Sequence, residues 1–291
     1  MKGMHGLNSG IVSPLLLDAW IREWLIEDIG RGDRTTEALA LESRMGGAQW
    51  VCKEVGIVAG LPVAARVFQM LSENLVFIPL AEEGMMCQVG QTIATLEGPL
   101  AALLTGERVA LNIAMRLSGI ATLTRQYVEQ IRDLPAQLVD TRKTTPGFRA
   151  LEKYATRVGG AMNHRMGLDD AVMLKENHIA AAGGIGEAIA QVRRTAPYPL
   201  SIEVETENLE QVKEAIAHQA DIIMLDNMSS VEMRSAVEMI RAANPKIKIE
   251  ASGNITLKTI RAVAETGVDY ISTSAPITRS SWLDLSMRIT A

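Results

Sequence analysis

Charged and hydroxyl-bearing residues end five successive apolar runs in the second half of the chain. Each run is rich in Val, Ile and Leu, and its last residues are of kinds that a buried strand rarely carries. In chain order these residues are Arg142 and Lys143, then Lys175, then Glu203 and Glu205, then Asp226, and finally Glu250, Ser252 and Gly253. Cations facing carboxylates can bind a polyanionic substrate together with a divalent metal ion. The pattern therefore predicts an anion-binding active site.

The cationic residues lie in a segment whose charge differs from that of the whole chain. Residues 140–175 hold seven Lys or Arg and four Asp or Glu, a net +3, whereas the whole chain holds 29 and 34, a net −5. We expect Arg142, Arg165 and Lys175 to contact the anion, because two of them end apolar runs and the third follows a turn-like glycine-rich stretch. Three more cations recur at four-residue spacing and are expected on a helix's outer face: Arg149, Lys153 and Arg157.

The carboxylates form the other half of the predicted site. Glu203 and Glu205 are two residues apart and so share one face of their strand, and Asp226 ends the next run. Carboxylate oxygens and substrate phosphates are the ligands with which Mg²⁺ is usually held. The Ser252-Gly253 pair at the end of the fifth run offers backbone N–H groups to a terminal phosphate.

These residues need a scaffold that brings the strand ends together. After Pro135 short β-branched runs alternate with longer helical segments, which is typical of βαβ units on a parallel sheet. The runs cover 137–144, 170–177, 200–207, 220–227, 247–254 and 268–275, and the helices cover 150–158, 185–195, 208–218, 231–243 and 257–266. No G-x-G-x-x-G follows the first run, so a closed or nearly closed β/α barrel is favoured over an open dinucleotide-binding sheet. In a barrel the active site lies where the carboxyl ends of the strands meet.

The first half of the chain predicts a different kind of domain. A helix over 15–27 precedes short strands broken by Gly and Pro within 48–98, with one helix at 62–71, which together indicate a compact α+β domain. A long helix is predicted over 100–132, with Arg108, Asn112 and Arg116 as a polar stripe that fits a solvated face and a functional face equally well. We therefore expect an α/β protein of two domains, 1–114 and 115–275, with segment 276–291 a candidate to pack with the first.

Composition and charge exclude several classes of protein. A net charge of −5 disfavours a nucleic-acid or anionic-membrane binder. The longest uncharged apolar-rich stretch, 56–65, is interrupted by Gly and Pro and is far shorter than the ~20 residues that cross a bilayer, and we expect no signal peptide within residues 1–30. We expect a cytoplasmic protein. Cys52 and Cys87 have no histidine nearby, so buried free thiols are expected rather than a zinc site.

Several motifs resemble quinolinate phosphoribosyltransferase, the carboxylating nicotinate-nucleotide pyrophosphorylase. The matching segments, in the order of the family and over nearly the whole chain, are EDIGRGDRTT (27–36), GERVALNIAMRLSGIAT (106–122), DTRKTTPGFR (140–149), GGAMNHRMGLDDAVMLKENHI (159–179), IEVET (202–206), DIIMLDN (221–227) and EASGNIT (250–256). The resemblance implies an N-terminal α/β sandwich followed by an incomplete β/α barrel, active as a homodimer or a hexamer of dimers. It also implies a Mg²⁺-dependent reaction that joins quinolinate to 5-phosphoribosyl-1-pyrophosphate and releases pyrophosphate and CO₂, yielding nicotinate mononucleotide for NAD biosynthesis.

The resemblance also implies roles for individual residues. Those that would bind the quinolinate carboxylates are Arg142, His164, Arg165, Lys175 and, from the partner subunit of a dimer, the residue equivalent to Arg108. Those that would bind the other substrate are Lys143 and Lys175 at the pyrophosphate, Glu205 and Asp226 at the ribose and Mg²⁺, and Ser252, Gly253 and Asn254 at the 5-phosphate. Lys143, Lys175, Glu205 and Asp226 would thus be the catalytic residues. Where many members carry glycine near that phosphate this sequence has Ser274, which still offers an N–H and a hydroxyl.

Two other functions fit parts of the pattern. A barrel aldolase or decarboxylase could use Lys143 or Lys175 as a Schiff base. A transport-associated relative of the family would keep the fold and the anion site but bind another ligand. A purely structural role would leave the charged strand ends without a purpose.

Overall fold

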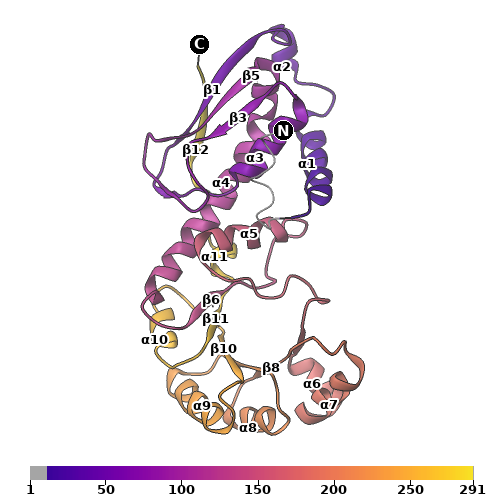
Figure 1. Ribbon diagram of the computed structural model, residues 1–291, viewed down its shortest axis with the longest axis vertical. Helices are drawn as coiled ribbons and strands as arrows, with labels where there is room; N and C mark the ends of the chain where they lie inside the picture. Colours follow the sequence, from indigo (N-terminus) through magenta and orange to yellow (C-terminus); the bar gives the residue numbers. More distant parts are fainter. Residues whose placement is uncertain (1–11, 291) are drawn as a thin grey trace. The chain divides into compact units, whose positions relative to one another are not determined.

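The computed structural model describes residues 12–290, which form two compact units (Figure 1). The first unit contains residues 12–125, 150–159 and 279–290, and the second contains residues 126–149 and 160–278. This division differs from the expected boundary at 114/115. The reasons are that the long helix continues past residue 114 without a break and that a helix from the middle of the chain belongs to the first unit.

The first unit is built on a four-stranded antiparallel sheet in the order β12-β1-β5-β3. Its strands are β1 (Met45–Cys52), β3 (Val76–Pro79), β5 (Thr92–Pro99) and β12 (Leu285–Thr290), and a separate ribbon joins β2 (Gly56–Ile57) to β4 (Met86–Cys87). Its shorter helices are α1 (Pro14–Ile29), α2 (Arg34–Ala38) and α3 (Leu61–Leu71). Trp50, Phe68 and Phe77 pack together in its core. Because β12 pairs with β1, the C-terminal segment completes this sheet. Cys52 and Cys87 are buried free thiols, as predicted.

Helix α4 (Leu100–Ile131) is the predicted long helix, and α5 (Arg149–Gly159) follows it in the chain. Arg116, from the predicted polar stripe, donates to buried Glu152 of α5 at 2.7 Å and to Ser280 Oγ at 2.9 Å. That part of the stripe is therefore not a solvated face. The expected outer face of α5 is also wrong for Lys153, which is fully buried, and only Arg157 of its three cations is exposed.

The second unit is a six-stranded parallel sheet in the order β6-β11-β10-β9-β8-β7, with helices on its outer side (Figure 1). The strands are β6 (Gln137–Val139), β7 (Val172–Leu174), β8 (Ile202–Thr206), β9 (Ile222–Asp226), β10 (Lys248–Ser252) and β11 (Tyr270–Ser272). The helices are α6 (Glu176–Ala182), α7 (Ile185–Thr195), α8 (Leu209–Ala217), α9 (Ser230–Ala243), α10 (Ile260–Ala264) and α11 (Ala275–Thr278). The sequence predicted all six strands but not the short helices α6 and α11.

The barrel of the second unit is incomplete, because its edge strands β6 and β7 do not pair with each other. An extended segment lies beside β6 instead. Met162 N–H donates to the Leu138 carbonyl at 2.9 Å, and Asp140 N–H donates to the Met162 carbonyl at 3.2 Å. This segment continues directly into His164 and Arg165, so the gap in the barrel is where two predicted site residues enter. Within residues 12–290 no helix is both long and apolar enough to cross a lipid bilayer.

Candidate active site

Three neighbouring strands carry the acidic side of the site. Glu203 and Glu205 alternate with buried Val204 on β8, and Asp226 ends β9. Ser252, the last residue of β10, is in register with Asp226. Because side chains alternate across a strand, Glu203 and Glu205 share the face that lies opposite Ile202 and Val204. The parallel arrangement thus gathers these groups at the carboxyl ends of the strands, as the sequence predicted.

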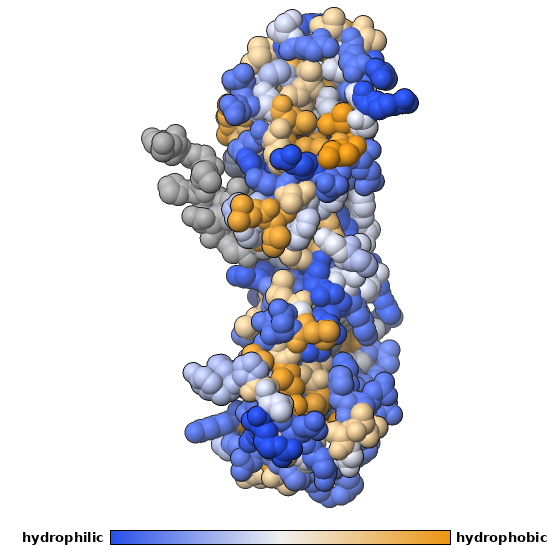
Figure 2. Space-filling model, turned by 90° about the vertical axis from the view of Figure 1, so that its right-hand side faces the viewer, coloured by the Kyte–Doolittle hydropathy of each residue, from blue (hydrophilic) through white to orange (hydrophobic). Residues whose placement is uncertain are grey.

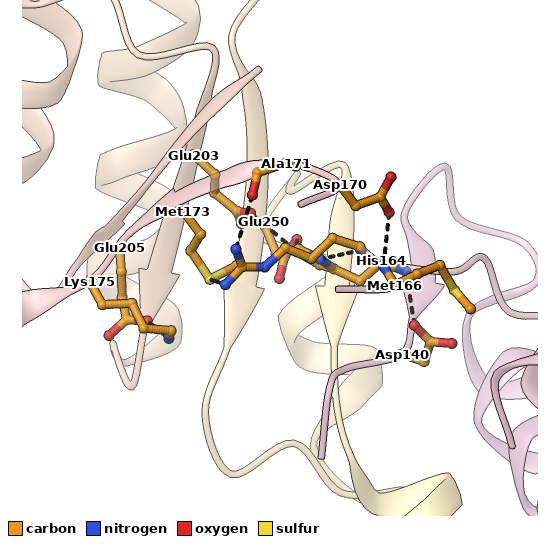
Figure 3. Close-up of polar contacts among 11 residues, drawn as sticks. Asp140, His164, Met166, Asp170, Ala171, Met173, Lys175, Glu203, Glu205 and Glu250 are labelled. Carbon is orange, nitrogen blue, oxygen red and sulfur yellow. Dashed lines mark hydrogen bonds and ion pairs between the residues drawn. The ribbon is translucent and has the colours of Figure 1, made fainter. Parts of the chain in front are cut away.

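His164 lies between two buried carboxylates (Figure 3). Its Nε2 is 3.2 Å from Glu203 Oε2 and 3.3 Å from Glu250 Oε2. Both glutamates are almost fully buried, and the second oxygen of each, Oε1, has no hydrogen-bond partner in the described structure. Burial lowers the pKa of His164, but the hydrogen bonds and the negative charges of the two glutamates outweigh this and raise it to about 10. Burial raises the pKa of Glu203, so the cluster retains a proton.

The position of that proton decides whether the cluster can bind a metal ion. The Arg165 N–H donates to His164 Nδ1 at 2.7 Å, so the Nδ1 lone pair is occupied and a neutral ring must carry its proton on Nε2. The raised pKa favours the charged ring, which carries a proton on each nitrogen and gives up the acceptor at Nδ1, so Nε2 is protonated in either form. A protonated nitrogen cannot be a metal ligand. His164, Glu203 and Glu250 therefore form a proton-bridged cluster, and the spacing of their ligand atoms also suits a metal ion, which would have to displace the proton on Nε2.

The cationic wall is held by contacts within the barrel gap. Arg165 donates to the Ala171 carbonyl at 3.0 Å and to Met173 Sδ at 3.5 Å, which orients its guanidinium. Burial and then the positive charge of Arg142 lower the pKa of Arg165, whereas Glu203 raises it. An anion that binds between two guanidinium groups relieves their mutual repulsion and accepts hydrogen bonds from both. Arg142 and Arg165 are therefore suited to bind an anion.

Asp140 and Arg149 fix the loops that carry these cations. Buried Asp140 accepts from the His164 N–H at 2.8 Å and from Asn163 Nδ2 at 2.7 Å. Arg149 donates to Thr144 Oγ1 at 3.0 Å and to the Met166 carbonyl at 3.1 Å. The prediction that Arg149 lies on an outer helix face is therefore wrong, since it ties the loop after β6 to the segment after His164.

Lys175 and Glu205 form an ion pair that the sequence alone did not predict. Lys175 caps the start of α6, and its ammonium group donates to Glu205 Oε2 (Figure 3). The Lys175 side chain is 44% exposed and that of Glu205 is 15% exposed, so the lysine remains accessible to a substrate while the carboxylate is mostly covered.

The loops after β9 and β10 are linked through Asn227. Asn227 Nδ2 donates to Asp226 Oδ2 at 2.7 Å, and Asn227 Oδ1 accepts from Asn254 Nδ2 at 3.1 Å. The Asn227 N–H donates to the Ser252 carbonyl at 3.0 Å. Sequence analysis missed Asn227, because asparagine after a strand is an ordinary turn residue. It also gave Glu250 no partner, since the contact with His164 joins residues that are 86 positions apart.

Three other predicted site residues have no described contact with the residues above. Lys143 is exposed in the loop after β6, and Ser274 is half-buried just before α11. Arg108 is exposed on α4 in the first unit, so it belongs to a different unit from the residues described above.

Glu205 and Asp226 offer the donor chemistry that Mg²⁺ requires. Both supply carboxylate oxygens, and Mg²⁺ completes its shell with water and substrate phosphates. Asp226 Oδ2 is held by Asn227, and Oδ1 has no hydrogen bond among the described residues. Glu205 Oε2 is shared with Lys175. The donor atoms of these two residues therefore fit a magnesium ion.

The fold and the site together define an enzyme with an incomplete α/β barrel whose site is suited to bind anionic substrates. Residues 33–118 match the family described as quinolinate phosphoribosyl transferase, N-terminal domain, and residues 120–288 match its C-terminal domain. The chain belongs to the quinolinate phosphoribosyltransferase family, as its motifs predicted.

Individual relatives agree with this assignment. The chain is 62% identical over 275 residues to a probable nicotinate-nucleotide pyrophosphorylase (carboxylating) of Synechocystis sp., covering 94% of this chain and 93% of the relative. It is 46% identical over 279 residues to the corresponding Bacillus subtilis protein, covering 96% and 95%. The crystal structure of NadC from Streptococcus pyogenes superposes with a TM-score of 0.91 at 40% identity, covering 96% of this chain and 98% of that one.

Proposed function

We propose that the protein transfers the phosphoribosyl group of 5-phosphoribosyl-1-pyrophosphate to quinolinate and decarboxylates the product to nicotinate mononucleotide. Membership of the family supports the reaction. The observation that carries it in the structure is the Arg165 guanidinium, which is held by the Ala171 carbonyl and Met173 Sδ, feels the positive charge of Arg142 and lies in the same unit as the carboxylates Glu205 and Asp226. A dianionic aromatic acid needs the two cations, and a magnesium-bound polyphosphate needs the two carboxylates.

In this proposal the cations bind both carboxylates of quinolinate. Arg142, Arg165 and Lys175 supply more positive charge than a single carboxylate requires, and guanidinium forks bind carboxylates in a fixed plane. His164 presents no free ring nitrogen, because Arg165 N–H occupies Nδ1 and the two glutamates face Nε2. We therefore propose that His164 contributes by its position, since it holds Glu203 and Glu250 beside the cations.

The other substrate would lie along the remaining strand ends. Lys143 and Lys175 would neutralise the pyrophosphate, Glu205 and Asp226 would hold the ribose hydroxyls and Mg²⁺, and backbone N–H groups at Ser252, Gly253, Asn254 and Ser274 would face the 5-phosphate. Bound Mg²⁺ supplies charge stabilisation at the departing pyrophosphate. The cationic groups then stabilise charge that develops in the transition state, which is commonly the largest contribution to catalysis.

The electron flow requires no nucleophilic side chain. The pyridine nitrogen forms the bond to C1 of the ribose while the C1–O bond to pyrophosphate breaks with its electron pair. The nitrogen then carries positive charge, so the electrons released when the 2-carboxylate leaves as CO₂ are stabilised at the adjacent carbon. A proton from solvent completes nicotinate mononucleotide. The protein has only to orient the two substrates and balance their charges.

The aldolase alternative is disfavoured by the Lys175–Glu205 ion pair. A Schiff-base lysine must attack a carbonyl group with a free amine, whereas the Lys175 side chain is engaged in a hydrogen bond to Glu205 Oε2. Lys143 is exposed in a loop and lacks the desolvated surroundings that activate such a lysine.

The proposal is tested by assaying the purified protein with phosphoribosyl pyrophosphate, Mg²⁺ and either quinolinate or nicotinate. We expect nicotinate mononucleotide and CO₂ from quinolinate and no detectable product from nicotinate, which lacks the 2-carboxylate. EDTA should abolish activity without unfolding the chain, and added Mg²⁺ should restore it. Comparable turnover of nicotinate, or full activity in the metal-free sample, would contradict the proposal.

We also propose that the active form is a homo-oligomer, a dimer or a hexamer of dimers, in which Arg108 completes the neighbour's site. The first unit exposes large apolar side chains on β3 and the following segments, among them Val76, Ile78, Leu80 and Met86. Hydrophobic side chains also gather in patches on the face shown in Figure 2. Exposed apolar groups of this number favour burial against another subunit. We also propose that the protein is cytoplasmic, as the sequence analysis predicted.

Mixing two inactive variants tests whether Arg108 is shared. Arg108→Ala and Lys175→Ala should each be folded and inactive or nearly so. After subunit exchange, a mixed dimer has one site with both defects and one with neither, so activity should return to up to half of the wild-type value per mixed dimer. If mass spectrometry confirms exchange and no activity returns, Arg108 does not act in the neighbouring subunit.

A further inference from the structure

Asn227 stands between two groups to which the proposed function gives separate tasks. On one side is Asp226, proposed to hold Mg²⁺ and the ribose, and on the other is the Ser252–Asn254 turn, proposed to bind the 5-phosphate. Asn227 makes one hydrogen bond to Asp226 Oδ2 (2.7 Å), one to Asn254 Nδ2 (3.1 Å) and one from its N–H to the Ser252 carbonyl (3.0 Å). One side chain therefore contacts both loops.

The backbone around this contact is held in unusual conformations. Asn227, Gly253 and Asn254 have φ of 54°, 95° and 50°, all in the left-handed region. A Cβ atom at Gly253 would lie 2.2 Å from Asn227 Oδ1 and 2.8 Å from Asn227 N, so only glycine fits there. Left-handed asparagines cost energy that the surrounding contacts must offset. Such a cost is commonly retained where a loop must hold one geometry for function.

We propose that Asn227 is a positioning residue that couples the metal-binding carboxylate to the phosphate-binding turn; this inference rests on the proposed function. The side-chain Nδ2 of Asn227 donates to Asp226 Oδ2 and so orients this carboxylate, which leaves Oδ1 available to a ligand. Its carbonyl oxygen holds Asn254, which fixes the turn that follows β10. Asn227 thereby supports the binding of magnesium–phosphoribosyl pyrophosphate at two places, the metal and ribose at Asp226 and the 5-phosphate at the Ser252–Asn254 turn. Asn227 itself does not contact the substrate in this proposal.

The test compares Asn227→Gly with Gln219→Gly. Glycine keeps the left-handed backbone and its N–H bond but removes the side chain. Gln219, with φ of 60°, precedes β9 at the opposite end of the strand, so its replacement is a matched control for the backbone change alone. Both variants are compared with wild type in thermal unfolding, in calorimetric titration of phosphoribosyl pyrophosphate with Mg²⁺ in the absence of quinolinate, and in steady-state kinetics.

We expect Asn227→Gly to weaken phosphoribosyl pyrophosphate binding and raise its KM by about 10- to 100-fold, the range for losing a hydrogen bond to a charged group. The Mg²⁺ concentration for half-activation should rise with it. The KM for quinolinate should stay within about twofold, because the cations lie on other strands, and Gln219→Gly should match wild type. A purely structural role of Asn227 would lower the melting temperature without this selective loss.

Three results would overturn the inference: unchanged phosphoribosyl pyrophosphate binding in Asn227→Gly, an equal loss in Gln219→Gly, or an equal rise in the KM for quinolinate. If Asn227→Gly does not fold, Asn227→Asp replaces it, since aspartate tolerates the left-handed region and keeps the acceptor for Asn254. It removes the donor and places a like charge beside Asp226, so an unchanged KM for phosphoribosyl pyrophosphate would again refute the role. A wild-type protein that makes no nicotinate mononucleotide refutes the proposed function instead, which separates the two failures.

Discussion

Replacing Arg165 with alanine is expected to lower kcat/KM for quinolinate by about 10²- to 10⁴-fold. The expected size follows from losing two charge-assisted hydrogen bonds, each worth about 1.5–3 kcal/mol. Arg165 is already oriented by the Ala171 carbonyl and Met173 Sδ, so little entropy remains to be lost when it binds the substrate. The measurement is steady-state kinetics at saturating phosphoribosyl pyrophosphate and Mg²⁺.

Two further variants make the Arg165 test specific. Arg165→Lys keeps the charge but loses the guanidinium fork, and we expect about a 10- to 100-fold loss. Arg193→Ala removes an arginine from α7 whose side chain contacts only the Gln219 carbonyl among the contacts described, and it should retain wild-type kinetics. A loss below tenfold for Arg165→Ala in a folded protein would mean that Arg165 does not bind the substrate.

Replacing His164 with alanine is expected to destabilise the protein by about 3–5 kcal/mol near neutral pH, the range for breaking a buried ion pair. The change leaves Glu203 and Glu250 facing each other without the proton donor between them. Both are almost fully buried, and neither can reach solvent to recover the lost interaction. Chemical denaturation measures the free energy of unfolding, and His164→Gln, which retains an N–H donor, is the matched variant with a smaller expected loss.

The cost of His164→Ala should depend on pH in a defined direction. The pKa of His164 is raised to about 10, so its stabilisation of the wild type is fully present below the ordinary histidine pKa near 6.5 and is lost as the pH rises through 10. Between pH 5 and 7.5 this contribution falls by about 1.4 kcal/mol, the value of one pH unit above 6.5. The variant must instead protonate a buried carboxyl group, and because burial raises the pKa of Glu203 above its ordinary value, this proton uptake becomes costlier as the pH rises.

Because a carboxyl group in the unfolded chain is already ionised near pH 5 whereas histidine is ionised only below about 6.5, the second effect acts over more of the range, so the destabilisation should be greater at pH 7.5 than at pH 5. Denaturation curves of both proteins at the two pH values give this difference directly. A cost that is the same at both pH values would show that no proton is exchanged between His164 and the glutamates.

The sequence by itself determined the two-domain α/β class, the six barrel strands, the long helix and the family. These follow from local patterns: apolar runs of strand length, three- and four-residue spacing in helices, and motifs such as DTRKTTPGFR. The motifs and their order along the chain can be read without knowing how the chain folds. The positions of Arg142, Lys175, Glu205 and Asp226 at strand ends could also be predicted, because parallel strands bring their carboxyl ends to one edge whatever the remaining packing is.

Only the tertiary structure decided which of these side chains pair. The bridge from His164 to Glu203 and Glu250, the Lys175–Glu205 ion pair and the Asn227–Asn254 hydrogen bond join residues that are 27 to 86 positions apart, and the last also depends on a left-handed backbone. The burial of Lys153 and the inward contacts of Arg149 reversed a helical-face prediction. Charge spacing along a helix cannot reveal what packs against it, because burial and pairing are set by non-local neighbours.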